Sequence, residues 1–337
     1  MNPIAIVNKT SDKYLEINFV TSNTCNYSCS YCWPECHAGT SRWPDFEKAC
    51  ASFDHLLNVY KVLGKEEIRL LCSGGEPTLW PKFGDFVKYI RDTHDIRVTI
   101  ATNGSRTARW WRDHADLFSD VHISIHHEYA NADHIIEVAD IIYETQKSMV
   151  SVGALMHPVR WEQCIENVDK FLNSGSEWMV KVAPLVDPDQ NEKIMEYTQD
   201  QLDYMSEKIK RFPPDEFIQK MKNLGNIQLD KTEAYVHYDN GQVHPYNKFD
   251  LMKNKQNSFV GWKCNLIKDR LMIWHNGKIH SNCFQDKMFA GKDLNIYQDD
   301  FIEKFNTDVI KPVICSQAFC GCSGDIRLTK YKHELPK

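Results

Sequence analysis

Short apolar, β-branched runs alternate along this chain with longer segments of helical periodicity, and this alternation constrains the fold more than any other feature. We expect strands at Ile17–Thr21, Ile68–Cys72, Val98–Thr102, Val121–His126, Val150–Met156 and Met179–Val182. We expect helices at Asp45–Leu63, Lys82–Thr93, Thr107–Phe118, His134–Met149 and Glu162–Leu172. Strands that alternate with helices are typical of a parallel sheet covered by helices. The predicted fold class is therefore α/β, a partial (β/α)6 TIM-like barrel.

Three cysteines follow the first expected strand directly. In barrels of this kind the loops at the C-terminal ends of the strands build the active site. Cys25, Cys29 and Cys32 have C-x3-C-x2-C spacing, which suits three corners of an iron–sulfur cubane and leaves its fourth iron without a protein ligand. The alternative is a zinc site that uses two of these cysteines together with Cys36 or His37.

A glycine pair followed by a carboxylate comes after the second expected strand, in Gly74-Gly75-Glu76. Paired glycines permit close approach of a ligand to the backbone, and Glu76 supplies a negative charge. Taken alone, Gly-Gly-Glu-Pro would be an ordinary turn. Its place after a strand, downstream of the three cysteines, favours a ligand-binding loop.

Together, these two motifs resemble the radical S-adenosylmethionine (radical SAM) superfamily, whose signature is CxxxCxΦC with an aromatic residue at Φ, here Tyr31. The resemblance implies a [4Fe-4S] cluster on Cys25, Cys29 and Cys32, with SAM chelating the remaining iron. It places Tyr31 in the cofactor site. It also implies that the carbonyls and the glutamate of Gly74, Gly75 and Glu76 receive the ammonium group of SAM.

The same resemblance extends to the ends of the third and fourth strands. By position, Asn103 and Ser124 match loops that bind the ribose and carboxylate of SAM. Many family members carry an aspartate two residues after the serine, where this chain has His126. His126, His127 and Glu128 either contact substrate or form a polar loop.

Adenine in this family often stacks on apolar groups near the last strand ends, which nominates Met156 and Val182 as its neighbours. The aromatic and basic run that contains Trp110 and Trp111 either stacks nucleobases or packs into the core.

The C-terminal part carries a second group of cysteines. Apolar runs flank Asn276-Gly277, which predicts a hairpin with a type I′ turn. Cys264 and Cys283 lie on the two flanks of this hairpin. Three further thiols follow within eight residues at Cys315, Cys320 and Cys322.

This arrangement resembles the twitch or SPASM-type extension of radical SAM enzymes and implies an auxiliary [4Fe-4S] cluster. Five cysteines favour one cluster, hence a twitch-like domain. The C-x4-C-x-C spacing departs from the usual CxxC, so the resemblance does not say which four of the five bind iron. A zinc knuckle is the alternative.

The domain prediction follows from these segments. We expect a radical SAM core over 1–186, a helical connector over 187–240, and a small α+β iron–sulfur domain with a β-hairpin over 241–337.

Composition limits the cellular context. No apolar run of about 18 residues predicts a membrane span, and the N-terminus lacks the regions of a signal peptide, so a cytoplasmic enzyme is expected. Twelve cysteines in such a chain favour metal or cluster ligation over disulfides. Residues 248–292 hold eight Lys and one Arg against three Asp, and this excess suits either an anionic substrate or a solvated surface.

The predicted function is reductive cleavage of SAM to a 5′-deoxyadenosyl radical that abstracts a hydrogen atom from a small polar, anionic or nucleotide-like substrate. Oxidation, epimerisation or rearrangement would follow, and the oxygen-sensitive clusters imply an electron donor of flavodoxin or ferredoxin type. Two alternatives are modification of a nucleobase in DNA or RNA, and modification of a ribosomally made peptide. Only 24 residues precede Cys25, too few for a leader-binding domain. A non-catalytic iron–sulfur or zinc module has no need for Gly74-Gly75-Glu76.

Overall fold

The computed structural model describes residues 1–10, 12–40, 43–187, 193–207, 209–225, 234–280, 293–316, 318, 320 and 328–333. The chain divides into two compact units. The core unit comprises Val20–Trp43 and Leu71–Leu229, and the second unit comprises Met1–Phe19, Pro44–Leu70 and Asp230–Lys337. No helix within the described ranges is long and apolar enough to cross a membrane.

The core unit is built on parallel strands. β4 (Arg97–Thr102), β5 (Asp120–Ile125), β6 (Met149–Met156) and β7 (Met179–Pro184) are parallel neighbours in that order. β3 (Glu67–Ser73) follows β4 in the strand order, and β10 (Ile209–Arg211) pairs antiparallel with β7. β2 (Tyr14–Val20) is the first of the six expected strands. All six are present, so the predicted strand set is confirmed.

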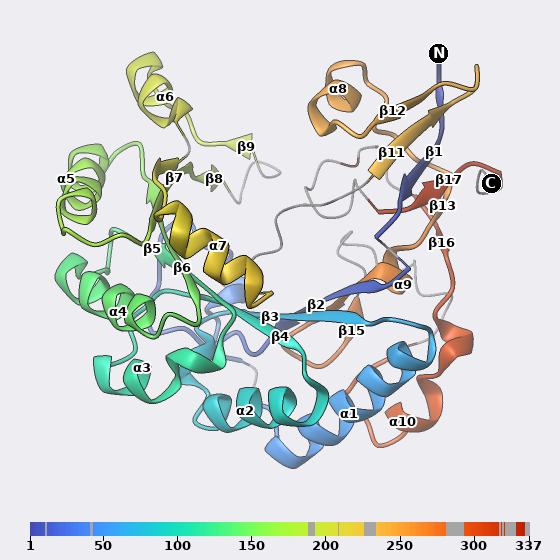
Figure 1. Ribbon diagram of the computed structural model, residues 1–337, viewed down its shortest axis with the longest axis horizontal. Helices are drawn as coiled ribbons and strands as arrows, with labels where there is room; N and C mark the ends of the chain where they lie inside the picture. Colours follow the sequence, from blue (N-terminus) through green and yellow to red (C-terminus); the bar gives the residue numbers. More distant parts are fainter. Residues whose placement is uncertain are drawn as a thin grey trace. The chain divides into compact units, whose positions relative to one another are not determined.

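Helices alternate with these strands, as Figure 1 shows. They are α1 (Phe46–Val62), α2 (Phe83–His94), α3 (Ala108–His114) with η3 (Ala115–Leu117), α4 (Ala132–Glu144) and α5 (Trp161–Leu172). The expected helix over 134–149 ends early, because Gln146 has a positive φ of 56° and Met149 already begins β6. Asn131 begins α4 by accepting hydrogen bonds from the backbone of Asp133 and His134.

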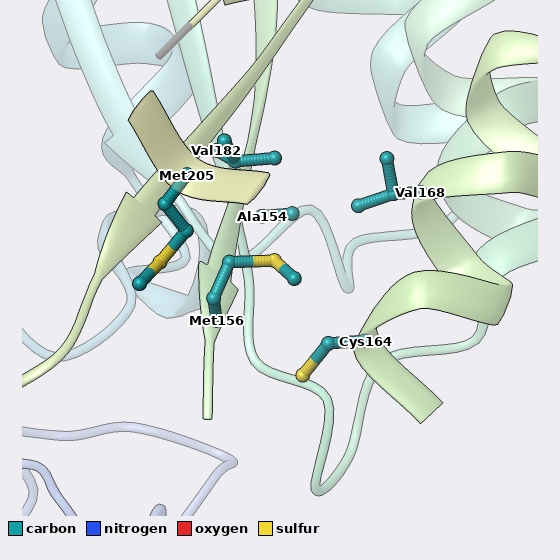
Figure 2. Close-up of a cluster of buried hydrophobic side chains, with 6 residues drawn as sticks. All are labelled: Ala154, Met156, Cys164, Val168, Val182 and Met205. Carbon is teal, nitrogen blue, oxygen red and sulfur yellow. The ribbon is translucent and has the colours of Figure 1, made fainter. Parts of the chain in front are cut away.

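One face of this sheet is packed against helices. Ala154 and Met156 of β6 and Val182 of β7 lie in a buried cluster with Cys164 and Val168 of α5, together with Met205 (Figure 2). Side chains alternate between the two faces of a strand. The residues between these apolar positions therefore point to the opposite face of the sheet.

Residues 187–240 contain more than helices. β8 (Val186–Asp187) pairs with β9 (Lys193–Ile194), and α6 (Gln199–Ser206) and α7 (Asp215–Asn223) follow with β10 between them. β11 (Ala234–Tyr238) pairs with β1 (Pro3–Asn8) in the second unit. Strands thus supplement the helices expected here, and the boundaries 1–186, 187–240 and 241–337 stay a prediction.

The second unit has two groups of strands. The first has the order β12-β11-β1-β17-β13-β16. Its remaining members are β12 (Val243–Pro245), β13 (Lys263–Cys264), β16 (Val313–Ile314) and β17 (Lys330–Tyr331). In the second, β14 (Arg270–Ile273) pairs with β2 and with β15 (Ile279–His280). The short helices are α8 (Lys248–Lys253), α9 (Leu266–Asp269), α10 (Phe301–Lys304) and η5 (Thr307–Val309).

The predicted hairpin at Asn276-Gly277 exists, but its turn is of another type. The Gly277 N–H donates to the carbonyl of Trp274 at 2.8 Å, and the Trp274 N–H donates to the carbonyl of Lys278 at 2.8 Å. Gly277 has a φ of 83°, whereas Asn276 is absent from the described residues with positive φ. A type I′ turn needs positive φ at both, so that prediction is wrong. The pattern is that of a turn followed by a glycine bulge.

An ion pair is buried in the second unit. The Lys65 ammonium donates to Asp269 Oδ1 and to the carbonyl of Tyr14, both at 2.9 Å, and the two charged side chains are 0% and 2% exposed. Burial raises the pKa of Asp269 to about 6, against the opposing effect of Lys65. Each charge therefore depends on the other for its stability in the interior.

Replacing Lys65 by methionine is expected to lower the free energy of unfolding by about 3–5 kcal/mol, because Asp269 is left buried without its partner. The double variant Lys65→Met/Asp269→Leu should recover most of this loss. Lys13→Met removes an ion pair to Glu66 whose side chains are 69% and 63% exposed, and it should change little. Urea unfolding of the four proteins measures this. Equal losses in the single and double variants would contradict the explanation.

Candidate active site

The three cysteines of the first motif lie in one loop of the core unit, directly after β2. The Cys32 N–H donates to the carbonyl of Cys29 at 3.0 Å and closes a turn. The Tyr27 N–H contacts Cys25 Sγ at 3.4 Å. Cys29 is buried, while Cys25 and Cys32 are partly exposed. The loop therefore holds three thiols, two of them open to solvent.

The thiols are close enough to influence one another's ionisation. Burial and then the charge of Glu128 and of Cys25 raise the pKa of Cys29 to about 11. A hydrogen bond with Cys36, followed by burial and the neighbouring cysteines, raises the pKa of Cys32. Thiolates in this loop thus need a positive partner, which a bound metal centre provides.

The donor set fits a cluster better than a single ion. The described residues contain no group of three His, Cys, Asp or Glu side chains placed around one metal ion. A zinc ion needs four ligands that converge at about 2.0–2.3 Å, whereas each cysteine of a cubane binds a separate iron. Three cysteines at C-x3-C-x2-C spacing in one loop suit the second arrangement. The zinc alternative for this loop therefore finds no preformed site among the described residues.

The glycine loop, Gly74-Gly75-Glu76, lies directly against the backbone of the cysteine loop. The Gly75 N–H donates to the carbonyl of Ser22 at 2.9 Å, and the Glu76 N–H donates to the carbonyl of Thr24 at 2.8 Å. A Cβ atom on Gly74 would lie 2.5 Å from the Ser22 oxygen, and one on Gly75 would lie 2.1 Å from the Thr24 oxygen. Both positions therefore require glycine, because one backbone packs on the other.

The Glu76 carboxylate is fully buried and fully hydrogen-bonded. Its Oε1 atom accepts from the Thr78 N–H at 3.1 Å, the Thr78 hydroxyl at 2.7 Å and the Thr102 hydroxyl at 2.8 Å. Its Oε2 atom accepts from the Asn103 N–H at 2.6 Å. Burial raises the pKa of Glu76, and these hydrogen bonds oppose the rise. The carboxylate links the ends of β3 and β4, and its expected contact with SAM stays a prediction.

Asn103 connects this carboxylate to the cysteine loop. Its amide nitrogen lies 3.0 Å from Asn26 Oδ1 and 3.8 Å from Cys25 Sγ. Its Oδ1 atom accepts from the Ser105 N–H at 2.9 Å. The predicted ligand Asn103 therefore lies beside Cys25. The predicted ligand Ser124 lies on β5, on the face of the sheet opposite α5.

Glu128 holds the cysteine loop from the other side, a role that the sequence did not indicate. Its carboxylate accepts from the Ser30 N–H at 2.8 Å and from the Ser30 hydroxyl at 2.5 Å. Arg160 Nε and His157 Nε2 lie 3.7 and 4.0 Å away. Burial raises the pKa of Glu128, but the hydrogen bonds from Ser30 outweigh it and keep the pKa below the usual value.

The two histidines beside Glu128 are neutral at pH 7, because burial lowers the pKa of each to about 4. His126 Nδ1 lies 3.0 Å from the Tyr31 hydroxyl, and the two rings stack. His127 Nδ1 lies 2.9 Å from the Asn167 amide nitrogen. Tyr31 itself packs with Cys29 and Leu185. The segment after β5 thus supports the cysteine loop.

The expected adenine neighbours are misplaced. Met156 is 0% exposed and Val182 is 2% exposed, and both point into the cluster under α5 (Figure 2). Neither is available to a ligand on the opposite face. Leu155, the residue before Met156, is the one that packs with the cysteine-loop cluster. The prediction of alternating side chains along these strands was correct, but the sequence did not show which of the two alternating sets of side chains faces α5.

Three of the five C-terminal cysteines lie in or beside the small sheet of the second unit. Cys264 is paired with Val313 of β16 and Lys330 of β17. The Cys315 N–H donates to the carbonyl of Trp262, and the Cys320 N–H donates to the carbonyl of Asn257. The ammonium of Lys330, which is 2% exposed, lies 3.6 Å from Cys320 Sγ. Cys283 and Cys322 lie outside the described residues.

Glu76→Gln is expected to leave donors such as the Asn103 N–H without an acceptor. The cost in free energy of unfolding should be about 1–3 kcal/mol, and iron bound after reconstitution should fall because Asn103, which contacts the cysteine loop, loses the carboxylate that fixes it. Glu35→Gln, at an exposed position near the same loop, is the matched control and should bind iron like the unmodified protein. Urea unfolding and iron analysis measure both effects. Unchanged stability and iron content in Glu76→Gln would contradict the linking role.

Comparison with known proteins identifies the family. A model of the radical SAM superfamily matches residues 19–202, more than half of the chain. GTP 3',8-cyclase of Edwardsiella ictaluri (strain 93-146) is 35% identical over 104 residues, 30% of this chain and 30% of that relative. The relative of the same name from Yersinia pestis is 35% identical over 108 residues, 30% of this chain and 31% of its own length. The chain thus spans about a third of these curated relatives.

Among solved structures, native anSMEcpe with bound AdoMet has a TM-score of 0.50 at 15% identity, over 88% of this chain and 82% of that one. At this identity the likeness concerns the fold alone, and it agrees with the predicted partial TIM-like barrel. Radical SAM enzymes use a [4Fe-4S] cluster together with SAM. The matched segment contains both the cysteine loop and the glycine loop, and the protein belongs to the radical SAM superfamily of enzymes.

Proposed function

We propose that Cys25, Cys29 and Cys32 hold the [4Fe-4S] cluster of a radical SAM enzyme that acts on a small polar or anionic substrate. The observation that carries this proposal is a loop with three thiols, fastened on one side by the glycine loop and on the other by Glu128. When bound and reduced, the cluster would supply the electron that cleaves SAM, and the resulting 5′-deoxyadenosyl radical would remove one hydrogen atom from the substrate.

The chain's own residues have positioning tasks in this proposal. The backbone carbonyls of the glycine loop would receive the SAM ammonium group. Asn103 and Ser124 would bind its polar groups, and Tyr31, whose ring is fixed by His126, would line the cofactor site. Neutral His126 adds no charge beside the cluster. A reductant of flavodoxin or ferredoxin type and a cytoplasmic location complete the proposal.

Cys29→Ala is expected to abolish formation of 5′-deoxyadenosine from SAM in the presence of dithionite, because one iron of the cluster loses its ligand. Cys50→Ala removes a buried thiol from α1 that belongs to neither motif, and should retain cleavage. Chromatographic quantification of 5′-deoxyadenosine, with the anaerobically reconstituted proteins, makes the comparison. Cleavage that persists in Cys29→Ala would refute the assignment.

We also propose that the C-terminal cysteines bind one auxiliary [4Fe-4S] cluster, as in a twitch-like domain. Its ligands would be four of Cys264, Cys283, Cys315, Cys320 and Cys322. The buried Lys330 ammonium supports this, because a cluster with four thiolates is negatively charged and needs a compensating charge in the interior. The same charge would also suit a zinc-bound thiolate, so iron analysis is required.

Replacing Cys25, Cys29 and Cys32 together by alanine is expected to lower the iron content from about eight to about four per chain. The remaining iron would belong to the C-terminal cysteines. Iron and sulfide analysis with Mössbauer spectroscopy of the anaerobic proteins tests this. A fall from about four to none would instead leave the C-terminal cysteines to zinc or to a structural role.

A purine nucleoside triphosphate is a second candidate substrate. The similarity to relatives named GTP 3',8-cyclase favours it. The similarity covers 30% of this chain, so it supports the nucleotide only as a candidate.

A further inference from the structure

The face of the parallel sheet opposite α5 carries polar groups that the cysteine loop does not use. At the start of the strands this face is covered by α7, whose Phe217 and Met221 pack with Met149 and Met179. Val180 and Val182 of β7 are buried, and Lys181 between them points to the opposite face. Lys181 is paired with Gly153 of β6, and Gly153 is paired with Ser124 of β5. These three residues form one row across the sheet.

Gly153 leaves a gap in the middle of this row. A Cβ atom at Gly153 would have one described neighbour within 4 Å, the carbonyl oxygen of Ile123 at 3.8 Å. Ser124 and Lys181 lie on the strands to either side, about 10 Å apart across two strand spacings. The gap is thus flanked by a hydroxyl on one side and by an ammonium on the other.

The Lys181 ammonium is half-buried, and among the described residues no hydrogen bond or ion pair to it is found. Burial lowers the pKa of Lys181, and the charge of Asp120 on the same face partly opposes this. The Ser151 hydroxyl lies on the same face, diagonally across from Lys181, where it meets His122 Nδ1 at 2.8 Å. A partly desolvated cation beside an open gap is suited to binding an anion.

The row lies next to the cysteine loop. Leu155 is two residues beyond Gly153 on the same face of β6, about 7 Å along the strand. It packs with the cluster formed by Cys29, Tyr31 and Leu185. An anion at Lys181 would therefore bring the rest of its molecule close to the loop where the radical is generated.

We propose that Lys181 binds a phosphate or carboxylate group of the substrate in the gap above Gly153, on the side opposite Ser124. This inference rests on the proposed function, because it takes Ser124 to be a contact of SAM. In this proposal the substrate is anionic, and Lys181 orients the substrate. SAM also carries a carboxylate, and the experiment distinguishes binding of the substrate anion from binding of the SAM carboxylate.

Pyridoxal is the probe, because its aldehyde condenses with a neutral lysine with loss of water and borohydride then fixes the adduct. The cluster-loaded protein would be labelled without air and digested, and the labelling of Lys181 followed by mass spectrometry. Pyrophosphate bound at Lys181 should lower this labelling about tenfold, and saturating SAM should leave it unchanged. Lys170, exposed on α5, is the reference lysine, and its labelling should change with neither compound.

Unchanged labelling of Lys181 in the presence of pyrophosphate, or its protection by SAM, would overturn the proposal. Lys181→Met provides a second measurement that does not use the label. Its affinity for SAM, measured by equilibrium dialysis, should match that of the unmodified protein, and a tenfold loss would assign Lys181 to SAM instead. Failure of the proposed function appears separately, as absent SAM cleavage in a protein whose Lys181 is still protected by pyrophosphate.

Discussion

The buried carboxylate of Glu76 is the interaction on which the candidate site depends. The cysteine loop follows β2 and the glycine loop follows β3. The two loops pack backbone against backbone, without a regular ladder of β-sheet hydrogen bonds between them. Glu76 joins them because its N–H donates to Thr24 in the cysteine loop, while its carboxylate accepts from Thr102 and Asn103 at the end of β4. A carboxylate that is buried away from water is stable only when such a set of hydrogen-bond donors surrounds it. The cysteine loop is thereby fixed relative to two strand ends.

The strands, and both motifs of the site, were predictable because their signals are local. In β6, Val150, Val152 and Ala154 alternate with small or polar residues, and all three are buried. This period is visible in any window of eight residues. The cysteine and glycine motifs are likewise short and contiguous. The sequence therefore predicts the order of the strands and helices and the reactive residues in the loops that follow the strands.

The supports of the site were not predictable, because they join residues far apart in the chain. Ser30 and Glu128 are separated by 98 positions, and nothing in either segment indicates the other. Met156 failed as an adenine neighbour because alternation alone does not say which set of residues meets the helices. The turn at Asn276 failed because the same two-residue signal serves both a primed turn and a glycine bulge.

The two faces of the parallel sheet differ in a way that assigns the proposed chemistry to one of them. The helix face is filled by side chains such as Met156, Cys164 and Val168 and has no room for a ligand (Figure 2). The opposite face carries Lys181 and the gap at Gly153, and at its end it meets the cysteine loop through Leu155. In the proposed function, a substrate would approach the radical on this face. The half-buried Lys181 there would favour anionic molecules, since a neutral one would leave the ammonium uncompensated.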